Sequence, residues 1–116
     1  MKLGEVCLLT CDVPRLASFY RMLLQCGENS DNAMHQTIVA AEPMLTVMHT
    51  DSLPEAQSAA IAFTVDDVVH EHERLRAAGV TILQMPERKP WGAVNMVIQD
   101  PDGRAVYLRQ LQGGAL

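Results

Sequence analysis

Glu5, Cys7, Tyr107 and Arg109 have side chains of types suited to proton transfer, nucleophilic attack or ligand binding. They occur as two pairs, and the members of each pair are two residues apart within runs of alternating polar and apolar residues. Such alternation is typical of a strand with one face on a core. We therefore expect each pair to project from one strand face while its apolar neighbours pack beneath.

Glu5 has two interpretations that the sequence leaves open. A carboxylate in a mostly apolar surrounding can act as a general base or accept a hydrogen bond from a ligand. Alternatively, Glu5 forms an ion pair with Arg109 or accepts a hydrogen bond from Tyr107, because a buried carboxylate is usually paired. Cys7 could be a nucleophile, but no histidine is predictably beside it, so a small core residue is favoured.

Trp91 and three methionines could supply apolar contacts to a ligand. Trp91 lies between a proline and a glycine, which predicts a loop. There an aromatic ring could cover a planar ligand as a lid or plug the edge of the core. Met44, Met48 and Met96 could line an adaptable apolar pocket or fill gaps in a core.

The elements that position these residues come in two copies. A strand-like run at 5–11 leads to Asp12 as a helix N-cap, an apolar helical stripe and Gly27 as the stop. A second strand-like run at 60–65 leads to a capping aspartate pair and a helix that Gly79 closes. An offset of about 55 residues superposes the copies, laying Asp12 on Asp67, Leu8 on Phe63, Val13 on Val68 and Tyr20 on Leu75.

Short β-like stretches follow each helix, so each copy is interpreted as a βαβββ module of an α+β fold. These stretches are residues 35–40 and 45–49 in the first copy, and 81–85, 93–99 and 105–111 in the second. The polar segment 28–33 could hold a frayed strand or only a loop, and residues 49–59 are the linker. We expect one domain over residues 1–116, with modules at approximately 1–52 and 58–116.

The sequence Asp100-Pro101-Asp102-Gly103 separates the last two stretches and predicts a hairpin with a type I turn. Proline presets φ near −65° at the second turn position, and an aspartate can accept hydrogen bonds from the backbone ahead of it. Gly103 accepts a positive φ at no steric cost. The turn is thus predicted from residue types alone.

Composition restricts the class of partner and the compartment. The 116 residues are 48% hydrophobic and carry a net charge of −5, which argues against nucleic acid or an anionic membrane as partner. Three cysteines without a CxxC pair predict neither a disulfide framework nor a structural zinc site. We expect a soluble, unprocessed cytoplasmic protein, because no run resembles a signal peptide or a bilayer-spanning segment.

The paired modules, with the motifs "CDVPRLASFYRMLL", "IAFTVDDVVHEHERLRAAGV" and "PWGAVNMVIQDPDGRAVYL", resemble the vicinal oxygen chelate superfamily. This superfamily includes glyoxalase I, extradiol dioxygenases, fosfomycin-resistance enzymes and bleomycin-resistance binding proteins. The resemblance covers nearly the whole chain. It implies a curved mixed sheet that forms a cup, with helices on the convex face and a ligand on the concave face, and it implies a homodimer.

The same resemblance implies that no metal site of the usual kind is present. Enzymes of the superfamily typically carry histidine or glutamate at four cup positions, which fall here on Glu5, Met44 or Thr46, Ala60 and Tyr107. Only the glutamate binds a hard divalent ion well, and a catalytic metal needs about three protein ligands. We therefore expect no metal and no cofactor.

The interpretation from sequence is a binding protein that holds or sequesters a small, partly apolar ligand. The residues expected to contact this ligand are Glu5, Cys7, Thr46, Met48, Ala60, Trp91, Met96, Tyr107 and Arg109. An alternative is a metal-dependent lyase or isomerase of glyoxalase type, or a dioxygenase-like enzyme, that uses Glu5 with His35 or His49 around a displaced metal. Metal-free acid–base catalysis by Glu5 and Tyr107 is a third possibility.

Overall fold

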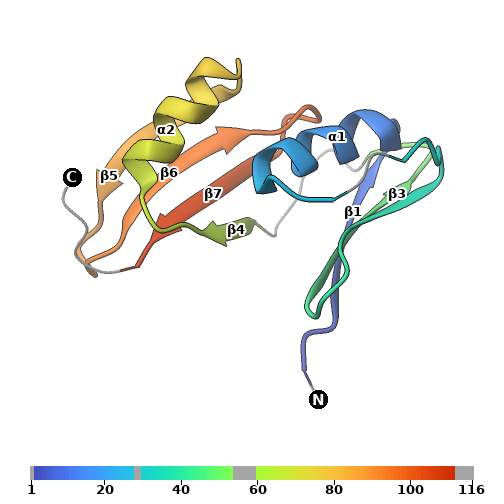
Figure 1. Ribbon diagram of the computed structural model, residues 1–116, viewed down its shortest axis with the longest axis horizontal. Coiled ribbons are helices and arrows are strands. Elements are labelled where there is room, and N and C mark those ends of the chain that lie inside the picture. The colour runs from blue at the N-terminus through green and yellow to red at the C-terminus, as the bar shows by residue number, and fades with distance from the viewer. Residues whose placement is uncertain (1, 28–29, 54–59, 112–116) are drawn as a thin grey trace. The chain divides into compact units, whose positions relative to one another are not determined.

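The computed structural model describes residues 2–27, 30–53 and 60–111, and it divides into two compact units, Met1–Ala56 and Gln57–Leu116 (Figure 1). Within the described residues the units hold two helices and seven strands in two open mixed sheets, which confirms the α+β fold class. The elements in chain order are β1 (Glu5–Thr10), α1 (Val13–Leu24), β2 (His35–Val39), β3 (Met44–His49), β4 (Ile61–Thr64), α2 (Val68–Ala77), β5 (Thr81–Arg88), β6 (Val94–Gln99) and β7 (Ala105–Gln110).

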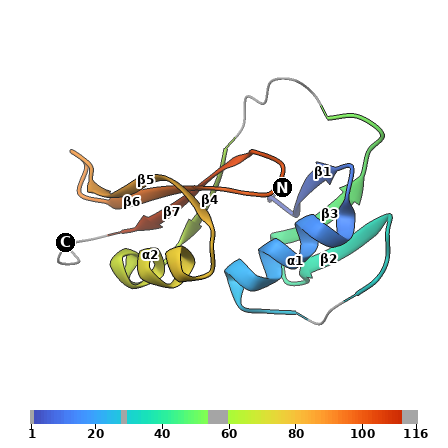
Figure 2. The ribbon, with the colours of Figure 1, turned by 90° about the horizontal axis from the view of Figure 1, so that it is seen from above.

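The first unit is a three-stranded sheet in the order β1-β3-β2 with α1 packed on one face (Figure 2). β1 runs parallel to β3, and β2 runs antiparallel to it. Alternate strand residues and the apolar stripe of α1 form the core, and its largest members include Leu16, Tyr20 and Val47. The amphipathic helix thus buries one sheet face and leaves the other without a helix.

The second unit is a four-stranded sheet in the order β4-β7-β6-β5, and α2 packs against β5, β6 and β7. β4 pairs with β7 in parallel, whereas the β6–β7 and β5–β6 pairs are antiparallel. Leu75 of α2 is fully buried, as are Ile98 of β6 and Val106 of β7. Neither helix in the described residues is long and apolar enough to cross a bilayer.

The two units repeat one topology, except at one strand. In each unit the first strand pairs in parallel with the last strand, and the last strand pairs with the strand before it along the chain. β5 has no counterpart in the first unit, because residues 30–33, the described part of the polar segment, form no strand. Of the two possibilities for this segment, the loop fits these residues, because they include an aspartate and an asparagine, which are depleted in strands. Residues 54–59 of the expected linker lie outside the described part of the chain.

Both helices begin at the aspartates that the sequence predicted. The Asp12 side chain accepts a hydrogen bond from the Arg15 backbone N–H at 3.2 Å, and the Asp67 side chain accepts one from the His70 N–H at 3.1 Å. These contacts satisfy backbone donors that have no partner inside the helix. The end of α1 was predicted incorrectly, because the helix stops at Leu24. The next residue, Gln25, lies two positions before Gly27 and adopts the left-handed conformation with a φ of 53°.

Replacing Asp67 with alanine is expected to destabilise the second unit by about 1 kcal/mol, because the His70 N–H loses its acceptor. Chemical denaturation followed by circular dichroism measures this change. Asp66→Ala is the matched control, since this neighbouring aspartate is exposed and is not the cap. An equal loss of stability in both variants would contradict the capping role.

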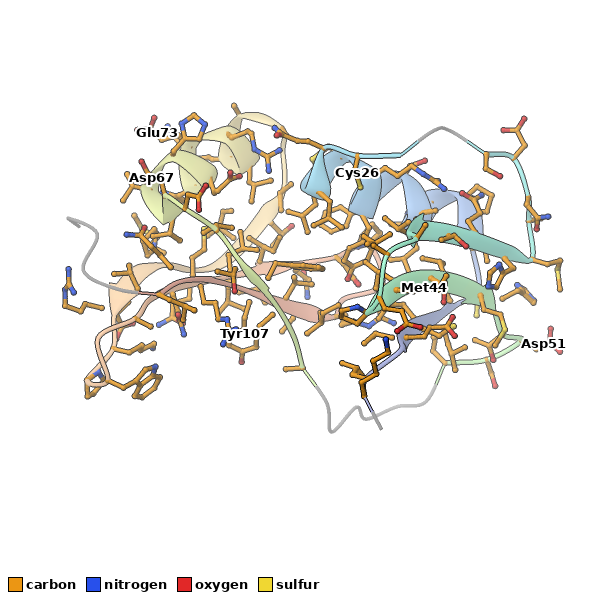
Figure 3. The ribbon with its side chains drawn as sticks, turned by 60° about the horizontal axis from the view of Figure 1, so that its bottom comes forward. Cys26, Met44, Asp51, Asp67, Glu73 and Tyr107 are labelled. Carbon is orange, nitrogen blue, oxygen red and sulfur yellow. The ribbon has the colours of Figure 1, made fainter. Side chains whose placement is uncertain are left out.

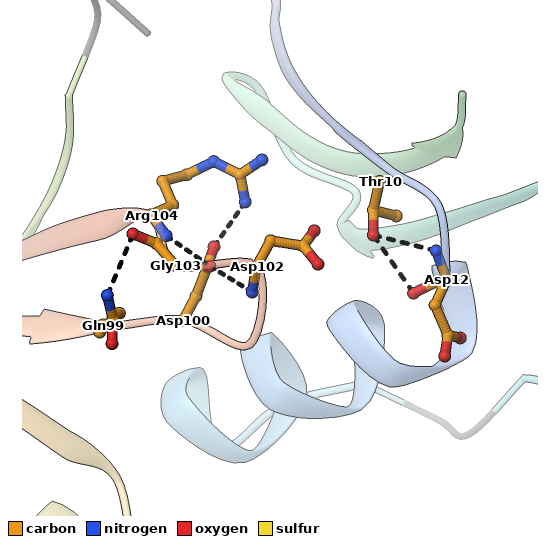
Figure 4. Close-up of polar contacts among 7 residues, drawn as sticks. All are labelled: Thr10, Asp12, Gln99, Asp100, Asp102, Gly103 and Arg104. Atoms are coloured by element: carbon orange, nitrogen blue, oxygen red, sulfur yellow. Dashed lines mark hydrogen bonds and ion pairs between the residues drawn. The ribbon is translucent and has the colours of Figure 1, made fainter. Parts of the chain in front are cut away.

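The hairpin turn between β6 and β7 is organised by Asp100, as Figure 4 shows. Its Oδ1 accepts hydrogen bonds from the backbone N–H of Asp102 at 2.9 Å and of Arg104 at 3.0 Å. Its Oδ2 accepts an ion-paired hydrogen bond from the Arg104 guanidinium. Gly103 has a φ of 83°, so both the predicted hairpin and the predicted role of this glycine are confirmed. The carboxylate is buried, so these contacts are shielded from water.

Candidate functional site

The candidate residues lie on the sheet faces that the helices leave open. In the first unit, strand pairing places Glu5 beside Met44, Cys7 beside Thr46 and Leu9 beside Met48. β2 adds two more residues to the same face, because His35 pairs with Met48 and Thr37 pairs with Thr46. We call this surface the first open face, and its members are Glu5, Cys7, Leu9, His35, Thr37, Met44, Thr46 and Met48.

Glu5 has a partner on this face that the sequence did not predict. The Thr46 hydroxyl donates a hydrogen bond to Oε2 of Glu5 at 2.6 Å. Thr46 is buried in the middle strand, whereas Glu5 is exposed. The short contact orients the carboxylate as an acceptor fixed to the sheet. The expected pairing of Glu5 with Arg109 or Tyr107 joins residues of different units and stays a prediction.

Cys7 is exposed rather than packed in the core, so the favoured core role for this residue was wrong. Strand alternation explains the exposure, because Val6 and Leu8 turn towards the α1 side and Cys7 turns away from it. Leu9 and Met48 are exposed on the same face. The first open face therefore combines one carboxylate with a thiol and apolar side chains.

The second unit has a corresponding open face on the side opposite α2. Ala62 of β4 and Val97 of β6 flank Tyr107 of β7. Thr64 and Asn95 flank Arg109 in the same way. Figure 3 shows the Tyr107 side chain on the side of the sheet away from α2, where the N-cap Asp67 and the helix residue Glu73 are labelled. We call this surface the second open face, and its members are Ala62, Thr64, Gln84, Glu87, Asn95, Val97, Tyr107 and Arg109.

Tyr107 and Arg109 are both exposed on this face, as their alternation with Val106 and Leu108 predicted. The Tyr107 side chain retains 36% of its accessible surface. The Arg109 Nε–H donates a hydrogen bond to Thr64 Oγ1 at 3.0 Å across the parallel β4–β7 pair. One edge of the guanidinium is thus fixed to the neighbouring strand.

Met96 lies in the core, not on an open face. Its relative exposure is 0%, and strand pairing places it beside Leu108, which is also buried. The placement follows from the alternation of β6, in which Asn95 and Val97 point to the open face and Met96 points to the α2 side. The gap-filling role, which was the alternative for this methionine, fits its position, and we remove it from the candidate site.

Trp91 and Ala60 are exposed and lie outside the strands. Trp91 is 74% exposed in the turn between β5 and β6, so its ring covers little of the core. The interpretation of Trp91 as a plug is therefore wrong, and a lid role stays a prediction. Ala60 directly precedes β4, where its methyl group offers neither a hydrogen bond nor a metal ligand.

The side chains at the four expected metal positions do not fit a divalent ion. Met44 and Thr46 lie on the strand beside Glu5, and Thr46 already occupies Oε2 of the glutamate. Alanine supplies no donor atom, and a neutral phenol such as Tyr107 is a poor ligand. The described residues contain no group of three or more histidine, cysteine, aspartate or glutamate side chains placed to bind a metal. No chemical step is therefore assigned to a metal.

Asn95 and Thr37 belong to the open faces but were not among the candidates from sequence. For Asn95 a signal was present, because Asn95, Val97 and Gln99 alternate with Val94, Met96 and Ile98. Alternation along this stretch predicts Asn95, and not Met96, as a residue of the open face. Thr37 carries no comparable signal, since its place depends on the pairing of β2 with β3.

A separate cleft of about 590 Å³ lies in the second unit between α2 and β5. Its lining residues are His72, Glu73, Arg76, Ile82, Leu83 and Met85. None of the site residues expected from sequence borders this cleft. The open sheet faces and the cleft are thus distinct surfaces.

Comparisons with known proteins found a matching family model and solved structures of similar fold. A family model described as the Glyoxalase/Bleomycin resistance protein/Dioxygenase superfamily matches residues 2–108. No curated protein sequence matches the chain significantly.

Solved structures with the same fold include a glyoxalase/bleomycin resistance protein/dioxygenase family enzyme from Burkholderia phytofirmans PsJN. It is 16% identical with a TM-score of 0.82, and the match covers 96% of this chain and 99% of that one. A glyoxalase-related enzyme from Fulvimarina pelagi is 20% identical with a TM-score of 0.78 and coverage of 95% and 88%. A lactoylglutathione lyase from Agrobacterium tumefaciens is 18% identical with a TM-score of 0.74 and coverage of 94% and 92%. At these identities the similarity shows the fold alone.

Proposed function

Because the chain belongs to the Glyoxalase/Bleomycin resistance protein/Dioxygenase superfamily, we propose that it binds a small, partly apolar ligand without a metal. The fold by itself is compatible with several chemistries, so the proposal depends on the side chains of the open faces. The ligand is held or sequestered, and no reaction is assigned.

The observation that carries the proposal is the set of side chains at the four metal positions. Glu5, the one carboxylate among them, is already bound by the Thr46 hydroxyl, and the other positions carry Ala60, Tyr107 and either Met44 or Thr46. Metal activation of a substrate needs about three protein ligands around the ion. These residues instead offer apolar contact with a few hydrogen-bonding groups, which is the usual composition of a small-molecule site.

Each unit has its own proposed ligand contacts, which lie on its open face and, in the second unit, also at two exposed residues outside the strands. From the first unit they are Glu5, Cys7, Thr46 and Met48, and from the second unit they are Ala60, Trp91, Tyr107 and Arg109. The exposed rings of Trp91 and Tyr107 supply apolar surface in the second unit. Glu5, Tyr107 and Arg109 are among the hydrogen-bonding groups.

The proposal includes a homodimer in the cytoplasm. β1 and β2 are edge strands of the first sheet, and β4 and β5 are edge strands of the second, so a second chain has edges to cover. The three cysteines are free thiols, which suits a reducing compartment.

A thermal-shift screen of hydrophobic and aromatic compounds tests this function. Compounds that raise the melting temperature of the wild type are expected to bind about tenfold more weakly to the Trp91→Ala, Tyr107→Ala double variant, because each lost aromatic contact is worth about 0.5–1.5 kcal/mol. Met85→Ala is the control, since it removes an exposed apolar side chain at the α2–β5 cleft. Unchanged binding of every compound by the double variant would refute the proposed site.

Elemental analysis of the purified protein separates this function from the metal-dependent alternative. We expect no stoichiometric divalent metal. Stoichiometric nickel, zinc or manganese that is lost on Glu5→Gln would instead establish a metal centre built on Glu5 and overturn the proposal.

A further inference from the structure

We propose that Arg109 on the second open face binds a carboxylate group of the ligand, with Tyr107 and Asn95 as flanking polar contacts. This inference rests on the proposed function and names the chemical class of the ligand. The ligand is thus a small organic acid with an apolar body.

The first support is a polar row that crosses all four strands of the second sheet. Thr64 of β4 pairs with Arg109 of β7, and Arg109 pairs with Asn95 of β6. Asn95 in turn pairs with Glu87 of β5. Residues paired across strands point to the same face, so these four side chains line one strip of the second open face.

The second support is the way in which Arg109 is held. Its Nε–H donates to Thr64 Oγ1 at 3.0 Å, which directs the guanidinium along the face. Among the described residues of the second unit, no carboxylate forms an ion pair with Arg109. The nearest acid in the row, Glu87, accepts a hydrogen bond from the Gln84 amide and lies 3.8 Å from Lys89 Nζ.

Two arginines of this unit that do form ion pairs show the contrast. Arg74 is paired with Glu71 at 2.7 Å, and Arg104 is paired with Asp100. Arg109 instead has a neutral hydroxyl as its fixed partner, so its terminal Nη groups are available to an added acceptor. The planar fork of a guanidinium matches the two oxygens of a carboxylate.

The third support is the pair of polar side chains next to the guanidinium, Asn95 and Tyr107. Asn95, directly beside Arg109, has a buried Oδ1 without a hydrogen-bond partner in the described part of the chain. The amide nitrogen of the same side chain carries two N–H donors of the kind that an anion accepts. The Tyr107 hydroxyl supplies a further donor from the same strand.

An apolar row lies next to the polar one. Ala62, Tyr107 and Val97 are paired side by side across β4, β7 and β6. The small alanine leaves one side of the Tyr107 ring without a bulky neighbour on the next strand. A ligand that places its acid group on Arg109 thus has an apolar surface for its remaining atoms one row away.

Titration of the ¹⁵N-labelled protein with 4-phenylbutyrate and with its neutral amide, 4-phenylbutyramide, tests this inference by NMR. We expect the wild type to bind the acid at least about tenfold more tightly than the amide, because hydrogen bonds to charged groups are the stronger class. The backbone signals of β6 and β7 are expected to shift on titration. Arg109→Gln should abolish the preference for the acid, and Arg109→Lys should restore part of it.

Arg76→Gln is the matched control, because this exposed arginine lies on α2 at the cleft instead of the open face. The dispersion of the NMR spectrum shows directly that each variant is folded. Equal affinity of the wild type for acid and amide, or equal weakening by Arg76→Gln and Arg109→Gln, overturns the inference. If both probes then bind and the Trp91, Tyr107 double variant weakens both, the proposed function stands. If neither probe binds at millimolar concentration, the inference falls, and the thermal-shift screen decides the proposed function separately.

Discussion

Replacing Asp100 with alanine is expected to lower the free energy of unfolding by about 3–5 kcal/mol, the cost of removing one partner from a buried ion pair. The Asp100 side chain is completely inaccessible, and that of Arg104 is 8% exposed. The variant leaves the guanidinium buried without its anion and removes the acceptor of two backbone N–H groups in the turn. Urea denaturation followed by circular dichroism measures the loss.

Asp100→Asn separates the effect of losing the charge from the effect of losing the acceptor of the two backbone N–H groups. The amide keeps an oxygen that can accept from the N–H groups of Asp102 and Arg104, but it carries no charge for the guanidinium. We expect the free energy of unfolding of Asp100→Asn to lie between that of the wild type and that of Asp100→Ala. Glu73→Gln is the charge-matched control, because it removes one exposed carboxylate of α2. A stability of Asp100→Ala within about 1 kcal/mol of the wild type would contradict the role of the turn.

Replacing Met96 with alanine is expected to cost about 2–5 kcal/mol, which is typical of truncating a buried methionine. Met96 is fully buried beside Leu108, so truncation removes packing contacts and leaves a cavity beneath α2. The same denaturation experiment measures the loss. Below its melting temperature, the folded variant is expected to bind ligands with wild-type affinity, because this side chain does not reach an open face.

Met85→Ala provides the comparison for the same change of side chain. Met85 is 66% exposed, so its truncation is expected to change stability by no more than about 0.5 kcal/mol. If Met96→Ala were as mild as Met85→Ala but weakened ligand binding, the assignment of Met96 to the core would be incorrect. The methionine would then return to the candidate site.

The hairpin and the helix starts were predictable because their causes lie within a few residues. The Asp100 carboxylate bonds to residues two and four positions ahead, and each capping aspartate bonds three positions ahead. The end of α1 was less predictable, because a glutamine can adopt the left-handed conformation when the chain reverses there. The position of a glycine alone therefore misplaced the helix end.

The candidate site was predictable in part. Strand alternation correctly placed Glu5, Tyr107 and Arg109 on open faces, since side-chain direction follows from the period of two. In β6 the same alternation directs Asn95 to the open face and Met96 to the core, so the expected ligand contact of Met96 was wrong. Cys7 was expected in the core from its residue type, although its position in the alternation pointed to the exposed side.

By itself the sequence determined the two-module α+β fold, the caps, the turn and the family resemblance, because each is encoded by short-range patterns of residue types. Only the tertiary structure decided which side chains meet. The Thr46–Glu5 and Arg109–Thr64 hydrogen bonds join residues 41 and 45 positions apart. Such contacts depend on the register between strands, which is fixed when each sheet packs against its helix and which no local pattern records.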